Sequence, residues 1–515
     1  MKPGPPTGAV SAAAHASASA VPVDAIGAER VDERLVAWCL AHRYALVVWA
    51  SMVGWSAVML RRAWSGYERF QYGRFDLGNM TQAVWSTAHG SVLASTNVAG
   101  EQASRLASHV DPILVLQAPL WLVWPSPLSL VLVQVVSIAL GALPVFWLAR
   151  RHLGSERPAC LLALAYLVYP WVAWTTLDAV HPKSLALPLL LFAFWFLDSD
   201  RLVAFTVFAV LAASTGELTG LTIGALGIWY ALEHGRRWAG TIIAFAGFAS
   251  SLIALEVVIP AFAGGQAGAF AAYASLGGSP QGMVRTLFTD PGAYADVLLR
   301  GDNLLYLVLL GAPLAGAFLL APWLALVAAP RLLVNMLADS GGTTDPRQHY
   351  QPSIIAIFFV ASIIGVARLA PAWRARAAVV VLASCLAFML SVGPWSWAPG
   401  APLWNRAAVS PGHVDALRRA VSLVPAAAPV SSTNSVGSHL SARRFVYTVP
   451  VVGSATWIVV DQKDPAVWSR VGGMLVFRSD PAELRRFTQR VERSPSWTRV
   501  FDEDGVLVFR RADVS

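Results

Sequence analysis

The stretch LSLVLVQVVSIALGALPVFWLA, residues 128–149, decides the fold class of this chain. It contains no Asp, Glu, Lys or Arg, and Arg150 and Arg151 follow it directly. A helix needs about 20 predominantly apolar residues to cross a hydrocarbon core of about 30 Å. The stretch therefore predicts a transmembrane helix, and its basic end predicts a cytoplasmic boundary.

The composition of the whole chain agrees with a membrane protein. Of its 515 residues, 56% are hydrophobic and only 13% are charged, with a mean hydropathy of +0.55. Soluble domains carry about a quarter charged residues. The formal net charge of +8 fits contact with lipid headgroups and gives no indication of a nucleic-acid partner. Cys39, Cys160 and Cys385 stand singly, so they predict neither disulfides nor a metal site.

Ten further apolar runs bring the predicted number of transmembrane helices to about eleven. They lie at about 43–61, 158–175, 184–197, 202–216, 218–233, 239–262, 303–320, 322–335, 352–368 and 377–394. These spans define a membrane domain over residues 41–395, preceded by a tail (1–40) whose first 33 residues we expect to be disordered. An apolar helix at 113–124 is too short to span, so we expect it to lie in the interface or dip in from one side.

Arginines between the spans indicate the orientation of the chain. Those at 150–157, 236–237 and 368–376 fall on one side of an eleven-span count, which the positive-inside rule makes cytoplasmic. We therefore expect a multi-pass protein of a bacterial plasma membrane with its N-terminus inside. The loops at 62–112, 176–183, 263–302 and 336–351 then lie outside.

Residues 396–515 have the sequence pattern of a small α/β domain, because apolar runs shorten to five or six residues there. The eleven-span count makes this domain extracytoplasmic. The pattern predicts helices at 413–424 and 481–491 and a hairpin from 497–501 to 506–510. Three more strands are predicted at 428–432, 445–449 and 456–461.

The first outer loop carries the sequence YGRFDLGNMTQAVW, residues 72–85, which is rich in groups that do chemistry. Asp76 lies between Phe75 and Leu77, and a carboxylate among apolar neighbours can act as a general base. The structural alternative is an interfacial amphipathic helix that Asp76 caps.

Other ionisable residues gather near span ends on the same predicted side. They are His109, Asp111, Asp178, His181, Glu217 and His349, with Tyr350 beside the last. Charged groups at a bilayer are costly, so their gathering on one face indicates function. Each has a structural alternative, such as an ion pair between Asp178 and Lys183. The histidines and carboxylates could bind a divalent metal, but no diagnostic spacing supports one.

Four motifs together carry a resemblance to a known family. They are FDLGNMTQAVW (75–85), SHVDPIL (108–114), DAVHP (178–182) and RQHY (347–350). The chain resembles a bacterial multi-pass membrane family of unknown function, domain of unknown function number twenty seventy-nine, grouped with GT-C glycosyltransferases. The likeness covers residues 40–510, including SHLSARR (438–444) in the C-terminal domain.

The resemblance implies a GT-C-like fold, an acidic base on the first outer loop and a polyprenyl-phosphate sugar as donor. Asp76 matches the position of that base. The substrate-binding residues expected around it are Arg74, Gln82, His109, Asp111, Asp178, His181, Glu217, His349 and Tyr350.

The leading hypothesis is a membrane glycosyltransferase that acts on the outer face and inverts the sugar's configuration. It would move a sugar from a polyprenyl-phosphate donor to an acceptor in envelope glycan, lipid or protein. A transporter or flippase of a lipid-linked molecule is the chief alternative, and Glu217 between two spans would favour it. A non-catalytic membrane scaffold is the third.

Overall fold

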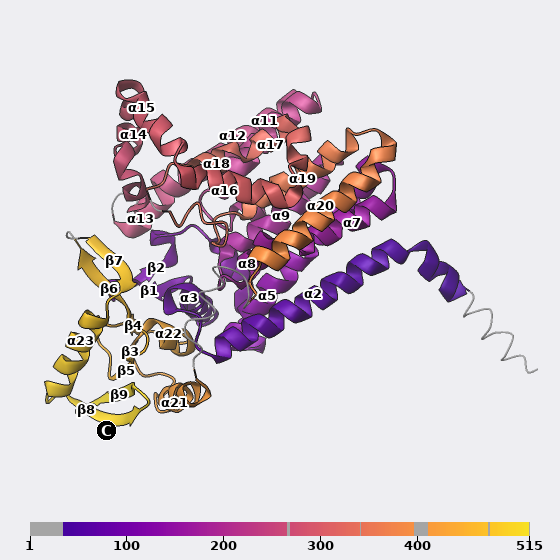
Figure 1. The fold of residues 1–515 in the computed structure, drawn as a ribbon. Coiled ribbons are helices and arrows are strands. Elements are labelled where there is room, and N and C mark those ends of the chain that lie inside the picture. Colours follow the sequence, from indigo (N-terminus) through magenta and orange to yellow (C-terminus); the bar gives the residue numbers. More distant parts are fainter. Residues whose placement is uncertain (1–33, 265–267, 340, 396–409, 472–473, 514–515) are drawn as a thin grey trace, which may run out of the picture. The chain divides into compact units, whose positions relative to one another are not determined.

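The computed structural model describes residues 34–264, 268–339, 341–395, 410–471 and 474–513 (Figure 1). The tail expected to be disordered, residues 1–33, lies outside them. Residues 34–41 are helical although the tail was predicted to continue to residue 40. Residues Met1–Val47 and Val48–Ser515 form separate compact units.

Within the described residues, four helices are long and apolar enough to cross a membrane. They are α2 (Arg43–Glu68), α5 with α6 (Pro127–Leu153), α12 with α13 (Arg237–Ala263) and α20 (Pro371–Val392). Two bent pairs would raise the count to six: α7 (Glu156–Leu167) with α8 (Pro170–Leu177), and α15 (Pro291–Leu298) with α16 and its extension (Gly301–Leu314). The helical membrane fold is therefore as predicted, whereas the count of eleven spans stays a prediction.

Shorter helices complete the membrane part. They are α9 (Ala186–Asp198), α10 (Leu202–Ala213), α11 (Thr219–Glu233), α14 (Pro280–Thr289), α17 (Pro322–Ala325), α18 (Ala329–Met336) and α19 (Pro352–Ala367). Helix α19 lies in the core, because 14 of its 16 residues are buried and it packs against α6 and α9. A segment expected to be an outer loop, residues 263–302, contains α14 and α15.

The first outer loop begins later than predicted, because α2 continues through Arg61 and Arg62 to Glu68. Phe70 then turns the chain with a positive φ of 57°. The loop folds into a π-helical turn η1 (Arg74–Gly78), helix α3 (Asn79–Ala88), and the hairpin β1 (Ala94–Thr96) and β2 (Gln102–Ser104). The short apolar helix follows as η3 (Pro112–Gln117) and α4 (Ala118–Val123).

The C-terminal part is a five-stranded sheet with helices. Its strands are β3 (Val430–Ser432), β4 (Val446–Thr448), β5 (Trp457–Asp461), β8 (Trp497–Glu503) and β9 (Val506–Arg511), in the order β4-β3-β5-β9-β8. Helices α21 (Pro411–Ser422), α22 (Asn434–Gly437) and α23 (Pro481–Arg493) accompany it. The strands and the two longer helices match the predicted segments. A separate hairpin, β6 (Ala466–Val471) with β7 (Met474–Ser479), was not predicted.

Aromatic stacking joins this sheet region to the end of α2. The ring of His439 lies between those of Tyr67 and Phe70, with centroid distances of 4.1 and 3.9 Å. Its Nε2 is 3.0 Å from the backbone carbonyl of Tyr67. Burial lowers the pKa of His439 to about 4, so the ring is neutral at physiological pH. The SHLSARR motif thus anchors the C-terminal part against the first outer loop.

Candidate functional site

The site is built around a loop that reverses the chain between α8 and α9. Helix α8 ends at Leu177 with Asp178 as its C-cap, and Ala179 adopts a positive φ of 55°, which turns the backbone toward His181. Gln134, buried in α5, holds this loop with both ends of its amide. It donates to the carbonyls of Thr176 and Ala179 at 3.0 and 2.6 Å, and its oxygen accepts from the amide of His181 at 3.0 Å.

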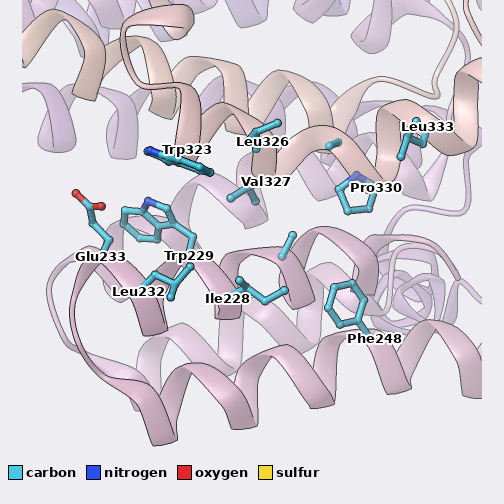
Figure 2. Close-up of a pocket in the computed structure, with 12 residues that line it drawn as sticks. Ile228, Trp229, Leu232, Glu233, Phe248, Trp323, Leu326, Val327, Pro330 and Leu333 are labelled. Carbon is cyan, nitrogen blue, oxygen red and sulfur yellow. The ribbon is translucent and has the colours of Figure 1, made fainter. Parts of the chain in front are cut away.

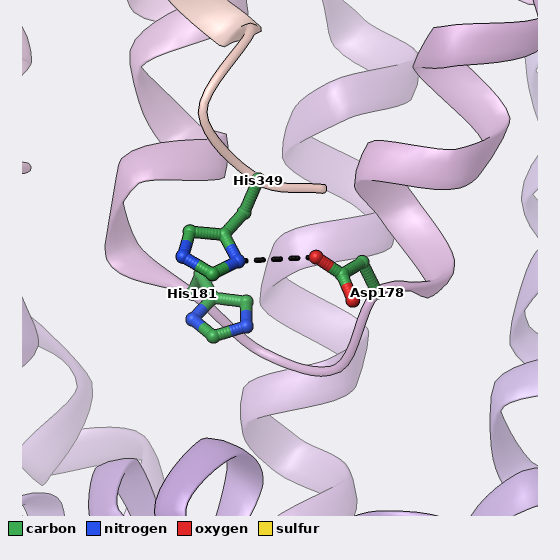
Figure 3. Close-up of side chains that lie close together, drawn as sticks. All are labelled: Asp178, His181 and His349. Carbon is green, nitrogen blue, oxygen red and sulfur yellow. Dashed lines mark hydrogen bonds and ion pairs between the residues drawn. The ribbon is translucent and has the colours of Figure 1, made fainter. Parts of the chain in front are cut away.

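Asp178, His181 and His349 lie together at this loop (Figure 3). The two imidazole rings stack with centroids 3.6 Å apart and planes inclined by 22°. His349 Nδ1 is 3.0 Å from a carboxylate oxygen of Asp178. His349 comes from the loop before α19, so the contact joins segments 171 residues apart in sequence.

Burial dominates the protonation of this cluster. It lowers the pKa of His181 well below its ordinary value, and the neighbouring His349 adds to the effect. Burial and then Lys183 do the same to His349. Burial also raises the pKa of Asp178. Both rings are therefore neutral at pH 7, and each has a nitrogen able to accept a proton or bind a ligand.

Asp76 faces this cluster from the first outer loop. Its carboxylate oxygen is 3.9 Å from Nε2 of His181, and its side chain is 45% exposed. The adjacent Leu77 is fully buried, which fixes the turn while the carboxylate reaches open space. The residue at the N-cap of α3 is Gly78, so Asp76 does not occupy the cap position that the structural alternative gave it.

Glu217 forms a second centre, in the break between α10 and α11. Its carboxylate lies 3.4 Å from the ammonium of Lys183 and 3.5 Å from Nδ1 of His109, and it accepts from the amide of Val110 at 3.2 Å. Burial alone would raise the pKa of Glu217, but Lys183 and His109 hold it well below its ordinary value. Lys183 therefore pairs with Glu217, and not with Asp178 as the structural alternative supposed.

Lys183 also connects the two centres. Its ammonium lies 5.8 Å from the centre of the Tyr350 ring, which is 4.4 Å from that of His349. A polar cavity of about 20 Å³, room for roughly one water, is lined by Lys183, Arg331, His349 and Tyr350 among others.

Three of the expected substrate-binding residues have other surroundings. Asp111 is 1% exposed and paired with Arg105 at 2.7 Å. Arg74 is equally buried, and its guanidinium donates to the carbonyls of Thr96 and Val446. Gln82 donates to Thr96 Oγ1 and to the carbonyls of Arg443 and Arg444. Because these side chains are committed to buried contacts, we do not include them among the proposed substrate contacts.

Sequence reasoning missed three contributors near the site. Gln134 is a polar residue inside the apolar stretch 128–149, which was a usable signal. Lys183 entered only as a structural partner of Asp178. Arg331, 6% exposed on α18, lies beside the polar cavity, and its Nη1 has no hydrogen-bond partner among the described residues.

The donor set of Asp178, His181 and His349 is chemically suited to a divalent metal. One ligand atom from each lies within 4.8 Å of the others, and imidazole and carboxylate are ligands for zinc or manganese. The ring centroids, however, are 3.6 Å apart and the ring planes are inclined by 22°. No point about 2.1 Å from a nitrogen of one ring therefore lies close to the plane of the other, so one ring would have to turn before the three groups could share a metal.

A larger, apolar groove lies beside the second half of α11, from Ala225 to Glu233 (Figure 2). Its volume is about 570 Å³, and it is lined by residues of α11, α12 and the α17–α18 segment. Glu233, Trp229 and Trp323 lie at one end and Phe248 and Leu333 at the other. Leu333 and Pro330 line the groove from the helix that carries Arg331.

The family described as "Predicted membrane protein (DUF2079)" matches residues 66–508. The chain belongs to this family. No curated protein matches the sequence. The membership agrees with the family resemblance of the motifs at 75–85, 108–114, 178–182 and 347–350.

Solved structures show which fold the chain shares. It is similar to ArnT from Cupriavidus metallidurans bound to undecaprenyl phosphate, with a TM-score of 0.50 and 11% identity over 89% of this chain and 97% of that one. The apo state of the same ArnT gives a TM-score of 0.48 at 11% identity, over 89% and 98% of the two chains. The likeness to the lipid-bound structure supports the GT-C resemblance in fold.

Proposed function

We propose that this protein is a membrane glycosyltransferase that moves a sugar from a polyprenyl-phosphate donor to an acceptor hydroxyl at the outer face of the plasma membrane. One observation carries the proposal: the partly exposed carboxylate of Asp76 lies 3.9 Å from His181, which stacks on His349, and His349 lines the polar cavity together with Lys183 and Arg331. A base and cations close to one another are what displacement of a phosphate by a hydroxyl requires.

The reaction would be a single displacement. The acceptor oxygen attacks the anomeric carbon of the donor as the bond from that carbon to the phosphate oxygen breaks. Asp76 takes the hydroxyl proton, and the polyprenyl phosphate leaves with the electron pair of the broken bond. The configuration of the sugar is inverted, because attack and departure occur on opposite faces.

The charges near the polar cavity would hold the departing phosphate. Lys183 and Arg331 supply positive charge there, and Nη1 of Arg331 has an unused donor among the described residues. The neutral ring of His181 can donate one hydrogen bond to the phosphate, whereas His349 uses Nδ1 in its contact with Asp178. A buried cation that faces a developing anion stabilises it more than it would in water.

The apolar groove would hold the polyprenyl chain. A helix advances about 1.5 Å per residue, so Ala225, which lines the groove, lies roughly 12 Å from Glu217 along the axis of α11. Its walls are exposed hydrophobic side chains, including Ile228, Leu232 and Trp323. The ArnT structure that shares the fold contains undecaprenyl phosphate, which supports a lipid of this class.

The proposal is tested with protein reconstituted in nanodiscs and a radiolabelled polyprenyl-phosphate sugar. Wild-type protein should transfer label to an envelope lipid or glycan acceptor, and Asp76→Asn should lose about a hundred- to ten-thousandfold in rate. Equal transfer by the two proteins would contradict the role of Asp76. Absence of both donor binding and transfer in wild type would contradict the function.

A transporter of a lipid-linked molecule is the second candidate, favoured by one observation. Glu217 lies at the break between the short helices α10 and α11 and pairs with Lys183, and interrupted helices around charged residues are typical of transporters. A liposome assay with a fluorescent polyprenyl phosphate separates the two, since a flippase equilibrates the lipid between leaflets without cleaving or forming a glycosidic bond.

A further inference from the structure

We infer that Asn434, in the C-terminal part, is a positioning residue for Asp76 and caps the turn that carries it. Its Oδ1 accepts from the backbone amides of Arg74 at 2.9 Å and Phe75 at 3.4 Å. These are the first two amides of η1, in which Asp76 is the third residue. The inference rests on the proposed role of Asp76 as base.

The turn has no cap of its own. Its N-cap residue is Gly73, and no side chain at that position bonds to the turn. Helical turns leave their first amides without partners unless a side-chain oxygen accepts from them, usually that of the N-cap residue itself. Here the oxygen comes from a residue 360 positions away in sequence.

Gly73 is required by the close approach of Asn434 and not by its backbone. Its φ and ψ of −87° and 162° suit any residue. A Cβ at this position, however, would lie 2.3 Å from Nδ2 of Asn434. The missing side chain of Gly73 therefore makes room for a cap supplied from elsewhere.

Close packing against glycines also holds the turn at its C-terminal end. A Cβ at Gly78 would lie 2.6 Å from Oγ of Ser441, and one at Gly437 would lie 2.7 Å from Cβ of Arg74. The C-terminal part thus packs on the backbone of η1 at both ends. Asp76 keeps its side chain 45% exposed and directed to His181.

Asn434 is itself firmly placed. It is 4% exposed and begins α22 directly after β3. The preceding Thr433 donates its amide to the carbonyl of Val459, and its Oγ1 accepts from the amide of Asp461. The following Ser435 donates its amide to Asp464 at 2.8 Å. The sheet therefore fixes the cap, and the cap fixes the direction of Asp76.

The test compares Asn434→Ala, which removes the acceptor, with Asn434→Asp, which keeps an oxygen there. Gly73→Ser in the Asn434→Ala background supplies a cap within the turn, because the space occupied by Asn434 is then free. Ser435→Ala is the control for disturbance of α22, since Oγ of Ser435 has no hydrogen-bond partner among the described residues.

Hydrogen exchange of residues 73–78 and transfer kinetics are both measured. We expect Asn434→Ala to raise exchange and lower kcat by about tenfold with the donor KM unchanged, because small misplacements of a reacting group reduce rate more than binding. Asn434→Asp and the double variant Gly73→Ser/Asn434→Ala should recover most of the protection from exchange and most of the wild-type kcat. Gly73→Ser alone should be impaired, because its side chain meets Asn434.

The outcomes separate this inference from the proposed function. If Asn434→Ala and Asn434→Asp lose exchange protection and kcat equally, and Gly73→Ser restores neither, the inference that Asn434 caps the turn is wrong. Unchanged exchange and kcat in Asn434→Ala would also contradict it. If exchange behaves as expected while wild-type protein transfers no sugar, the cap is supported and the proposed function fails.

Discussion

The ammonium of Lys183 lies 3.4 Å from the carboxylate of Glu217 and joins the loop after α8 to the break between α10 and α11. Both side chains are mostly buried, at 20% and 9% exposure. A buried pair of this kind contributes little over an apolar pair, but the loss of one partner leaves a buried charge without compensation.

The Lys183–Glu217 pair gives a stability prediction. Lys183→Met should lower the free energy of unfolding by about 3 kcal/mol, because Glu217 then remains buried without its cation, beside His109 and the amide of Val110. The double variant Lys183→Met/Glu217→Gln should regain most of that loss. Thermal unfolding in nanodiscs measures both, and additive losses in the double variant would show that the two side chains do not interact.

The two aspartates of the first outer loop should respond differently to Asn. Asp76→Asn should leave the unfolding temperature within error of wild type, because its side chain is 45% exposed. Asp111→Asn should cost about 3 kcal/mol, since Asp111 is the 1%-exposed partner of Arg105. A destabilised Asp76→Asn would indicate a structural role for that carboxylate.

The stacked histidines give a pH dependence. Their folded pKa values lie well below the ordinary 6.5, so the unfolded chain binds more protons as the pH falls through 6.5. The stability they contribute is thus complete above about pH 7 and decreases below pH 6.5. The raised pKa of Asp178 acts in the opposite direction and offsets part of it.

Unfolding temperatures between pH 8 and pH 5 test this dependence. The wild-type protein should lose stability steeply below pH 6.5, and His181→Gln/His349→Gln should lose less over the same interval. Identical profiles would contradict the assignment of the loss to these rings.

The apolar groove can be blocked without touching the charged site. Ala225 is 8% exposed and lines the groove, so Ala225→Phe should reduce binding of a polyprenyl phosphate at least tenfold. Val203→Phe is the control, because Val203 is 83% exposed on α10 and does not line the groove, so this variant should bind the lipid normally. Binding is measured with a short-chain and a full-length polyprenyl phosphate. If Ala225→Phe and wild type bind the full-length lipid with equal affinity, the polyprenyl chain does not occupy this groove.

Metal removal should leave transfer activity unchanged. The rings of His181 and His349 stack with planes inclined by 22°, and this arrangement must break before both can bind one ion. Activity after dialysis against a chelator, and again after added zinc or manganese, checks the prediction. Loss with the chelator and recovery with one metal would show that a ring turns to bind it.

Much of the fold could be read from the sequence, because apolar length and charge are local properties. The run at 128–149 lies within the helix Pro127–Leu153, and the segments at 456–461 and 481–491 match β5 and α23. The helices within 263–302 were missed, because residues such as Gly282 and Gly292 gave a loop-like texture. No element was predicted for the segment that forms the hairpin of β6 and β7.

The site was harder to predict, because its geometry depends on pairings between distant segments. The sequence predicted that Asp76, His181 and His349 lie on the same side of the membrane, but no sequence pattern indicates that the rings of His181 and His349 stack. Arg74 and Gln82 were expected at the substrate for their chemistry, whereas Val446 and the carbonyls of residues 443–444 occupy them. Such contacts follow from the tertiary structure and leave no local signal.

The cap that Asn434 gives to η1 has a consequence for the order in which the protein matures. Ribosomes add about 5–20 residues per second, so a turn begun at Arg74 waits roughly 20 to 70 seconds for a partner made 360 residues later. During synthesis the first outer loop thus exists with two uncapped amides and no packing at Gly78. A nascent or truncated chain that ends before Asn434 therefore carries Asp76 on an uncapped turn, and the enzyme we propose becomes competent only after its C-terminal part has been made.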